Sequence, residues 1–180
     1  MSDETLGEFF LRRFNPVHVE DGGDDILRGD FPDFARQFWK EVGFGRREDG
    51  FLWMLNPIRF SWLPELFGRT DLIPFARNSF DEVYFISTDG ICHHGSANDF
   101  TLNPMSVDFE TTVMNLSRRS ATDDEVIYAR HQNMWAQGTE INAEQCYCLA
   151  PAIPVGGDYE TSDIYVGSIK EYFSLLKEMQ

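Results

Sequence analysis

Cysteine and histidine side chains are the groups best suited to metal or nucleophilic chemistry in this chain of 180 residues. The candidates are Cys92, His93, His94, His131, Cys146 and Cys148. Zinc takes Cys and His ligands, and a Cys-x-Cys pair on a strand directs both sulfurs to one face. However, the usual short spacings of zinc ligands are absent, and adjacent histidines on a strand point to opposite faces. We therefore expect ordinary core thiols and hairpin histidines, with no cofactor.

Other catalytic patterns are also missing. The Gly-x-Ser-x-Gly turn that exposes a nucleophilic serine does not occur. Gly43-Phe44-Gly45 lacks the third glycine and the lysine of phosphate-binding loops. Carboxylate pairs are frequent, but chance pairs are expected among 30 acidic residues. These observations favour a protein that is not an enzyme, and a metal-dependent hydrolase that uses the Cys and His residues is kept as the alternative.

The charge balance excludes two classes of partner. The chain has 15 Lys and Arg against 30 Asp and Glu, a formal net charge of −15. Proteins that bind nucleic acids present basic patches to phosphates, and anionic membrane surfaces attract basic segments. Because both halves of the chain are acidic, we predict neither partner. A folded protein tolerates such self-repulsion when its acids face a cationic partner.

The predicted elements alternate between helices and strands without a βαβ rhythm. Apolar periodicity and caps predict helices over residues 3–14, from Pro32 to Gly43, from Pro57 onward, over 122–137 and over 168–179. Short apolar or alternating runs predict strands at 51–55, 74–77, 83–87, 91–94, 107–115 and 164–166, whereas 95–106 reads as irregular. The pattern predicts an α+β fold of mixed helices and mainly antiparallel strands in one compact unit.

Several local signals support these elements. Asp89-Gly90 between two apolar runs is typical of a hairpin. Ser2 is the predicted N-cap of the first helix, and Thr122 and Ser168 each open a capping box that ends in a glutamate. Aromatic residues recur at helix and strand spacing, which predicts that they belong to the core. These residues are Phe34, Phe38, Trp39, Phe51 and Trp53.

The sequence also indicates a compartment. No apolar run of about 18 residues predicts a transmembrane helix, and residues 1–14 lack the apolar region of a secretion signal. The three cysteines have no framework spacing, which fits reduced thiols in a cytosol. We expect a cytoplasmic protein.

Two stretches resemble known families. Residues 38–45, Phe-Trp-Lys-Glu-Val-Gly-Phe-Gly, and residues 49–57, Asp-Gly-Phe-Leu-Trp-Met-Leu-Asn-Pro, resemble the GAD-like domain, and residues 74–77 fit its continuation. Residues 146–157 and 164–176 resemble the domain that usually follows it in immunity proteins of bacterial type VI secretion systems. The chain departs from the family at Phe31, where leucine is usual, and at Pro154, which interrupts the second motif.

The resemblance implies a division into residues 1–105, the GAD-like segment, and residues 106–180, the immunity C-terminal segment, packed as one unit. It implies that the protein binds a cognate toxin, a DNase encoded next door, and occludes its active site. A nuclease presents a basic cleft to phosphates, which an acidic cytoplasmic protein complements. The candidate toxin contacts are Glu20, Asp21, Asp24, Asp25, Asp123, Asp124, Glu125, Asp158, Glu160 and Asp163. A regulatory scaffold with several partners is a further alternative.

Overall fold

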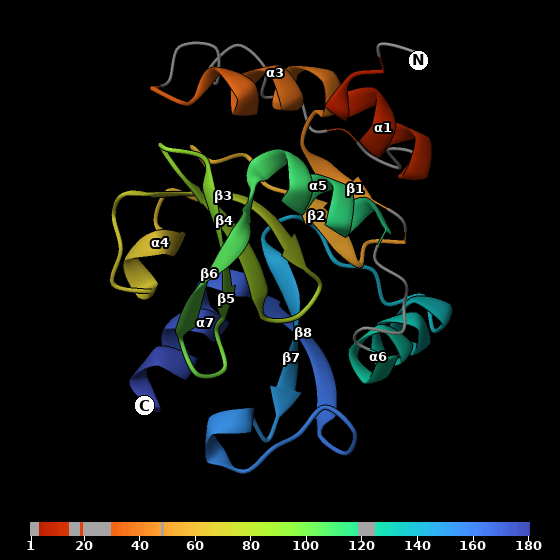
Figure 1. Cartoon of the computed structure of the whole chain (residues 1–180). Helices are drawn as coiled ribbons and strands as arrows, with labels where there is room; N and C mark the ends of the chain where they lie inside the picture. The colour runs from red at the N-terminus through yellow and green to blue at the C-terminus, as the bar shows by residue number, and fades with distance from the viewer. Residues whose placement is uncertain (1–3, 15–18, 20–29, 48, 119–124) are drawn as a thin grey trace.

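A central antiparallel sheet, in which the strands follow one another in chain order, runs through the computed structural model (Figure 1). Its strands are β1 (Gly45–Arg47), β2 (Leu52–Met54), β3 (Leu72–Asn78), β4 (Glu82–Ser87), β5 (Ile91–Ser96) and β6 (Thr101–Asp108). A second antiparallel sheet pairs β7 (Gln145–Ala150) with β8 (Asp163–Ser168). The structure describes residues 4–14, 19, 30–47, 49–118 and 125–180. The predicted α+β class is confirmed.

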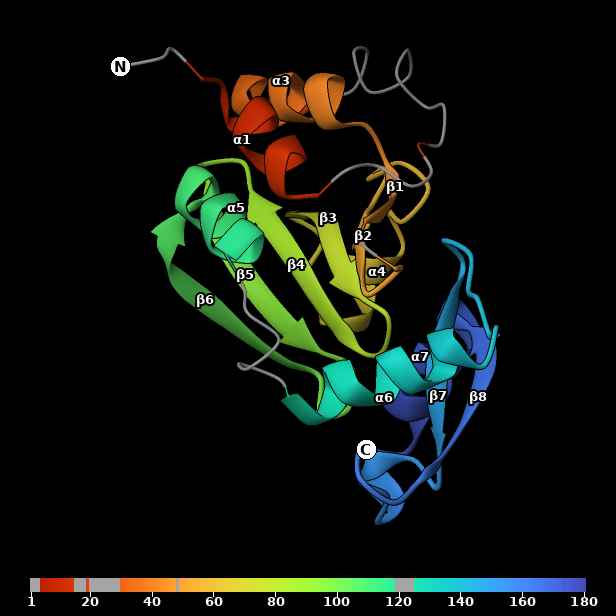
Figure 2. The same ribbon diagram turned by 90° about the vertical axis from the view of Figure 1, so that its right-hand side faces the viewer.

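Helices cover both faces of the central sheet. They are α1 (Leu6–Arg13), α3 (Asp33–Val42), α4 (Leu63–Leu66), α5 (Phe109–Arg118), α6 (Glu125–Ala136) and α7 (Ile169–Glu178), with a 3₁₀ turn, η1, at Ile153–Val155. In Figure 2, α1 and α3 lie above the sheet and α5 lies along its near face, whereas α6, α7, β7 and β8 gather at the other end. None of the helices in the described segments is long and apolar enough to cross a membrane.

Strand β4 separates two hydrophobic cores, because successive side chains of a strand point to opposite faces. Tyr84 and Ile86 join the first core, with residues of α1, α3 and α5. Val83 and Phe85 join the second core, with residues of α4, α7 and β7. Burial of a large apolar side chain contributes about 1.5–3 kcal/mol, so both faces hold the sheet in place. The predicted division after residue 105 falls inside β6.

The predictions for residues 95–106 and 107–115 are wrong over most of their length, although residues 97–100 form a turn and residues 107–108 belong to a strand. Residues 101–108 form β6, and α5 begins at Phe109. As the last strand of the sheet, β6 is half exposed and accommodates Pro104. Its polar residues and its proline are typical of a loop, which explains the wrong prediction. Asp108 ends the strand and caps α5, because its carboxylate accepts the backbone N–H of Thr111 at 2.8 Å.

The ends of other helices differ from the predictions in detail. Thr5, and not Ser2, caps α1 through a reciprocal capping box with Glu8, and Ser2 lies outside the described residues. The Ser168 hydroxyl caps α7 as predicted, whereas the box at Thr122 falls outside the described segments. After Pro57, only Leu63–Leu66 forms an α-helix.

The helical spacing of Tyr172, Leu175, Leu176 and Met179 predicts that these residues face the core from the last helix. This prediction is partly wrong. Tyr172 and Leu176 are buried as expected, but Leu175 and Met179 are exposed, and Phe173 takes an inner position. Because Phe173 is buried and Leu175 is exposed, the buried stripe of α7 is rotated about the helix axis relative to the predicted one. The rotation leaves Leu175 and Met179 on the solvent side of α7.

A buried arginine joins the two sheets. Arg77 on β3 is fully buried, and its guanidinium lies 5.1 Å from the ring centroid of Trp53. It donates hydrogen bonds to backbone carbonyls on its own strand and on the segment that enters β7. The acceptors are the carbonyls of Asn78 at 2.8 Å, Asn142 at 3.3 Å, Ala143 at 3.1 Å and Gln145 at 2.7 Å. The Arg77 guanidinium therefore supplies hydrogen-bond donors to four backbone carbonyls.

Candidate functional site

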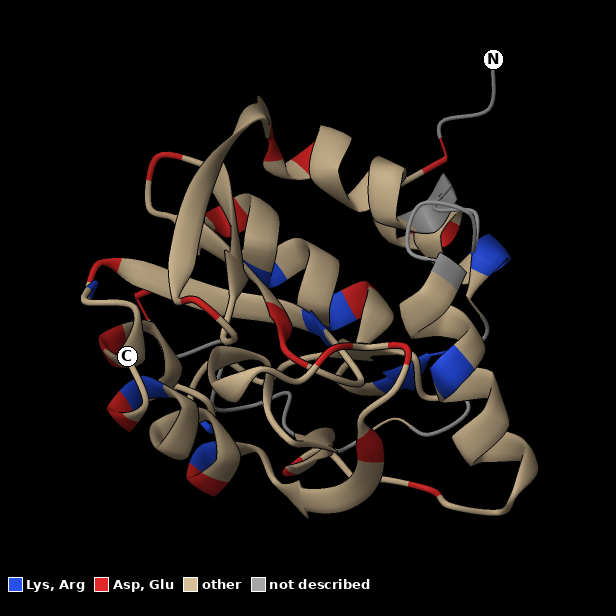
Figure 3. Cartoon of the chain, turned by 90° about the horizontal axis from the view of Figure 1, so that it is seen from below, with Lys and Arg blue, Asp and Glu red and all other residues tan. Residues whose placement is uncertain are grey.

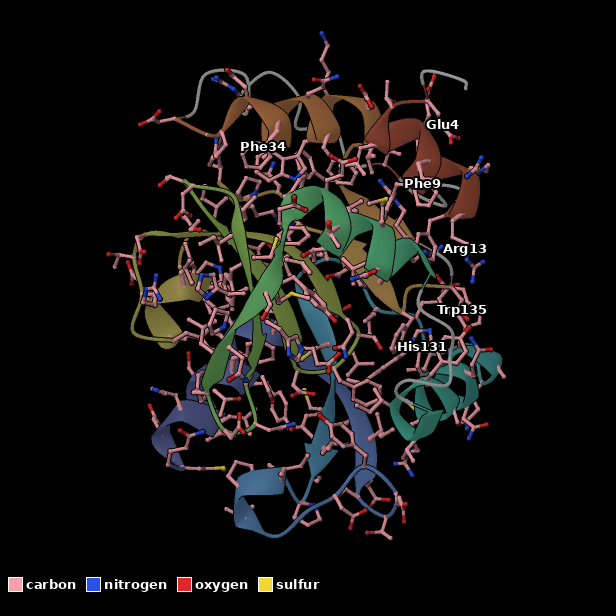
Figure 4. All side chains as sticks on the ribbon, in the orientation of Figure 1. Glu4, Phe9, Arg13, Phe34, His131 and Trp135 are labelled. Carbon is pink, nitrogen blue, oxygen red and sulfur yellow. The ribbon has the colours of Figure 1, made fainter. Side chains whose placement is uncertain are left out.

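An open groove lies between the layer of α1 and α3 and the layer formed by α5 with the adjoining ends of β5 and β6. Its volume is about 920 Å³. Figure 4 shows Glu4 near the start of α1 and Phe34 below α3, on the side that faces the sheet. The walls come from segments that begin at Glu4 and end at Glu110 in the sequence, so only the fold brings them together.

The floor of the groove is apolar. It is formed by Leu6, Phe34, Phe38, Ile91, Met105 and Phe109. Phe34 is 41% exposed and Ile91 is 45% exposed. The Phe34 ring is tilted against Phe109, with centroids 5.4 Å apart. The prediction that Phe34 belongs to the core stripe is therefore wrong, although Phe38 and Trp39 are buried as expected.

A tight turn closes one end of the floor. Gly90 has a φ of +89°, a conformation that glycine adopts without strain, and this supports the predicted Asp-Gly hairpin between β4 and β5. A Cβ at Gly90 would lie 3.5 Å from the tip of the Phe34 ring. The turn therefore approaches Phe34 closely and supports it from below.

Carboxylates rim this apolar floor. They are Glu4, Glu41, Asp89, Asp108 and Glu110, and the described residues that line the groove include no Lys or Arg. A hydrogen bond from the Ser87 hydroxyl lowers the pKa of Asp89, and the backbone N–H of Thr111 lowers the pKa of Asp108. Both groups are therefore charged at neutral pH.

Hydrogen bonds hold several of these carboxylates in place. Glu41 accepts from the Thr5 hydroxyl at 2.8 Å and from the Gln37 amide at 3.2 Å. Glu4 forms an exposed ion pair with Arg12 at 3.1 Å. The described lining includes neither His nor Cys. The arrangement suits the binding of a cationic group attached to an apolar one, because such a group satisfies the rim and covers the floor.

The predicted acidic contacts that the structure describes do not line this groove. Glu20, Asp21, Asp24, Asp25, Asp123 and Asp124 lie outside the described residues, and Glu125 is the first residue of α6. Asp158 and Glu160 share the loop before β8, and Asp163 begins that strand. Figure 3 shows acidic residues on loops and helices across the lower side of the molecule, interspersed with basic ones.

Within that loop, Asp158 stabilises the conformation of the backbone. Its carboxylate accepts the backbone N–H groups of Glu160 and Thr161, each at 2.7 Å, and the Thr161 hydroxyl. The contacts with Thr161 lower the pKa of Asp158. The carboxylate therefore shapes the loop and remains charged and exposed at its surface.

The cysteines and histidines do not converge. Cys92 lies in the first core, whereas Cys146 and Cys148 lie in the second, with their Sγ atoms 3.7 Å apart. Burial raises the pKa of Cys92 to about 11, so this thiol is protonated and a poor nucleophile. His131 on α6 lies 3.0 Å from a carboxylate oxygen of Asp49. In the described part of the chain, no three His, Cys, Asp or Glu side chains are grouped to hold a metal ion.

A buried carboxyl group links the central sheet to the loop before β8. Asp81 is 3% exposed and accepts hydrogen bonds from the Ser96 hydroxyl, at 2.7 Å, and from the Tyr159 hydroxyl. The Asn98 side-chain amide donates to the same Tyr159 oxygen at 2.6 Å. Burial raises the pKa of Asp81 to about 6, although the two hydroxyls favour its charged form.

The raised pKa of Asp81 makes stability depend on pH. In the unfolded chain the carboxyl titrates near its ordinary pKa of about 3.9, so between pH 4 and 6 the folded state holds the proton more tightly. The resulting stabilisation is complete below about pH 4 and is lost as the pH rises through about 6. Relative to Asp81→Asn, we expect the wild-type free energy of unfolding to fall by about 2–3 kcal/mol from pH 4 to pH 7.

Urea unfolding of both proteins across this pH range measures the difference. Asp158→Asn is the control, because the pKa of Asp158 is lowered and its contribution must disappear as the pH falls instead. A pH-independent difference between wild type and Asp81→Asn would contradict the assignment.

Sequence reasoning missed the groove because its carboxylates come from segments that are far apart in the sequence. The prediction selected clusters of neighbouring acids, whereas Asp89 and Asp108 have no adjacent acidic residue. The sequence signals that were available are local ones. They are the Asp-Gly turn at Asp89 and an aromatic residue, Phe34, in the first turn of α3.

Comparison with known proteins shows the fold. The sequence matches no protein-family model and no curated protein. Among solved structures, the chain is similar to Atu4351 from Agrobacterium tumefaciens, with a TM-score of 0.73 and 15% sequence identity over 95% of this chain and 88% of that one. The two proteins therefore share nearly the whole fold.

Proposed function

We propose that this protein is an immunity protein that binds a cognate type VI secretion toxin, a DNase, in the bacterial cytoplasm and occludes its active site. The observation that carries the proposal is the groove with an apolar floor and five carboxylates on its rim, in a protein whose net charge is −15. The resemblance of residues 38–57 and 146–176 to such immunity proteins supports the same function.

Charge complementarity explains how such a protein would act. A DNase active site must attract phosphates and is therefore basic. An acidic inhibitor is drawn to that site over a long range, and electrostatic steering raises association rates toward about 10⁸–10⁹ M⁻¹s⁻¹ at low salt. The apolar floor supplies the water-excluding contact that keeps the complex together once it has formed.

The experiment is an inhibition assay with the nuclease encoded by the neighbouring gene. We expect an equimolar amount of this protein to abolish degradation of plasmid DNA by that nuclease. We also expect the association rate to fall by about tenfold or more from low salt to 0.5 M salt, because salt screens the steering. Gel analysis of the DNA and stopped-flow fluorescence measure the two effects.

An unrelated acidic protein of similar size and net charge is the control, because a polyanion can compete with DNA without specific contacts. It should leave the nuclease active at the same molar ratio. Full nuclease activity in the presence of excess immunity protein would contradict the proposal.

A further inference from the structure

We propose that the groove between α3 and α5 receives one chain segment of the toxin, in which an apolar side chain is flanked by lysine or arginine residues. The inference rests on the proposed function and specifies the contact. The apolar side chain lies on Phe34 and Ile91, and the basic side chains face the carboxylates of the rim.

The floor is accessible without any rearrangement of the core. Phe34 and Ile91 are 41% and 45% exposed, and they lie beside the buried rings of Phe38 and Phe109. A concave apolar surface with a few polar groups at its edge is typical of binding sites, and aromatic residues are frequent among the residues that dominate binding energies. Phe34 rests on Phe109 and on the turn at Gly90, so little conformational freedom is lost when it is covered.

The distribution of the carboxylates favours an extended partner. Glu4 comes from the start of α1, Asp89 from the turn between β4 and β5, and Glu110 from the first turn of α5. In the described segments, no three of these carboxylates are close enough together to hold one metal ion. A chain segment with several basic residues can face carboxylates on all three elements, and its own apolar residues cover the floor.

The same charges disfavour a second copy of this chain as the occupant. Each copy carries a net charge of −15, and the described lining of the groove contains no cation that could pair with the carboxylates of a partner copy. Like-charged surfaces repel, and their juxtaposition is costly. Nucleic acid is disfavoured for the same reason, because its phosphates are negative.

The rim is also preorganised. Asp108 is fixed by its cap contact with Thr111, Asp89 by the Ser87 hydroxyl, and Glu41 by Thr5. Carboxylates that are already ordered lose little conformational entropy when a cation arrives. Each retains lone pairs that can accept a charge-assisted hydrogen bond, and an arginine can donate two such bonds from its planar guanidinium.

Two substitutions test the groove in the complex with the toxin. Phe34→Ala removes the apolar anchor, and Glu110→Lys reverses an exposed rim charge. We expect each to weaken the affinity for the toxin by about tenfold or more and the double variant by about 100-fold or more. Isothermal titration calorimetry measures the affinities, and thermal unfolding confirms that the variants are folded.

Matched controls lie on α7, at the opposite end of the molecule from α3 (Figure 1). Leu175→Ala removes a side chain that is 43% exposed, and Glu178→Lys changes the net charge by the same amount as Glu110→Lys. Both should bind within about threefold of wild type, since substitutions outside a hot spot are nearly neutral. Equal effects of groove and α7 substitutions would overturn the inference. So would a result in which Glu160→Lys, outside the groove, weakens binding while Phe34→Ala and Glu110→Lys do not.

A second experiment tests the groove without the toxin, by measuring the binding of peptides. The probes are a short fluorescent amphipathic peptide of lysine and leucine and a matched peptide of lysine and serine. We expect the leucine peptide to bind wild type more tightly, and Phe34→Ala to remove this preference.

If the toxin is not neutralised but the peptide preference depends on Phe34, the proposed function fails and the groove remains a site for cationic apolar segments. If the toxin is neutralised, but Phe34→Ala and Glu110→Lys leave the toxin affinity unchanged and the peptide preference does not depend on Phe34, the inference about the groove fails and the proposed function stands.

Discussion

Arg77→Met is expected to lower the free energy of unfolding by about 4 kcal/mol. Arg77 is completely buried and donates to the carbonyls of Asn78, Ala143 and Gln145. Methionine fills much of the same space but donates no hydrogen bond, so these carbonyls lose their charged partner. A buried acceptor left without a donor costs about 1–3 kcal/mol, and disruption of a buried charged contact typically costs about 3–5 kcal/mol.

Urea unfolding followed by tryptophan fluorescence measures the loss. Arg69→Met is the matched control, because Arg69 is partly exposed and pairs with Asp71 at 2.6 Å on the surface. Exposed ion pairs contribute only about 0–1 kcal/mol, so the control should unfold nearly as wild type does. Equal losses at the two positions would show that the carbonyl cluster does not depend on the guanidinium.

The second large effect is expected at Gly157→Ala, which should cost roughly 3 kcal/mol or more because it forces two parts of the backbone apart. A Cβ at Gly157 would lie 1.9 Å from the carbonyl oxygen of Pro151, far inside any permitted contact. That oxygen accepts the Ser162 hydroxyl at 2.9 Å, and the Gly157 N–H donates to Ala152 at 3.0 Å. Relief of the clash therefore breaks the hydrogen bonds that close the loop.

The neighbouring glycine provides the comparison. A Cβ at Gly156 meets nothing within 4 Å, but its φ of +94° is unfavourable for alanine, so Gly156→Ala should cost about 1–2 kcal/mol. Thermal unfolding of the two variants side by side separates backbone strain from the steric clash. A loss at Gly156 as large as that at Gly157 would contradict the role of the close approach to Pro151.

Local chemistry made several elements predictable. The spacing of Phe38, Trp39 and Val42, followed by Gly43, identifies α3 with nearly correct ends. The Asp-Gly turn identifies the hairpin of β4 and β5. In both cases the deciding interactions lie within a few residues of one another, so a short stretch of sequence contains the whole argument.

Elements fixed by tertiary contacts were not predictable in the same way. Phe109, Val113 and Leu116 form the buried face of α5, but Val107 before them suggested an alternating strand. The helix is stabilised by the Asp108 cap and by the packing of its buried face in the first core. The groove is a stronger case, because Glu4 and Glu110 belong to elements that no local rule places side by side. The contacts proposed from neighbouring acids remain predictions.

The order of the strands has a consequence for synthesis in the cell. In the central sheet β1 to β6 pair successively with their neighbours in the chain. Most of these pairings close a short loop at low entropic cost, and the longer connection from β2 to β3 contains α4. Hairpins can therefore be added one at a time as the polypeptide leaves the ribosome. Early assembly shortens the interval in which a nascent chain exposes unpaired strand edges, which are prone to aggregate.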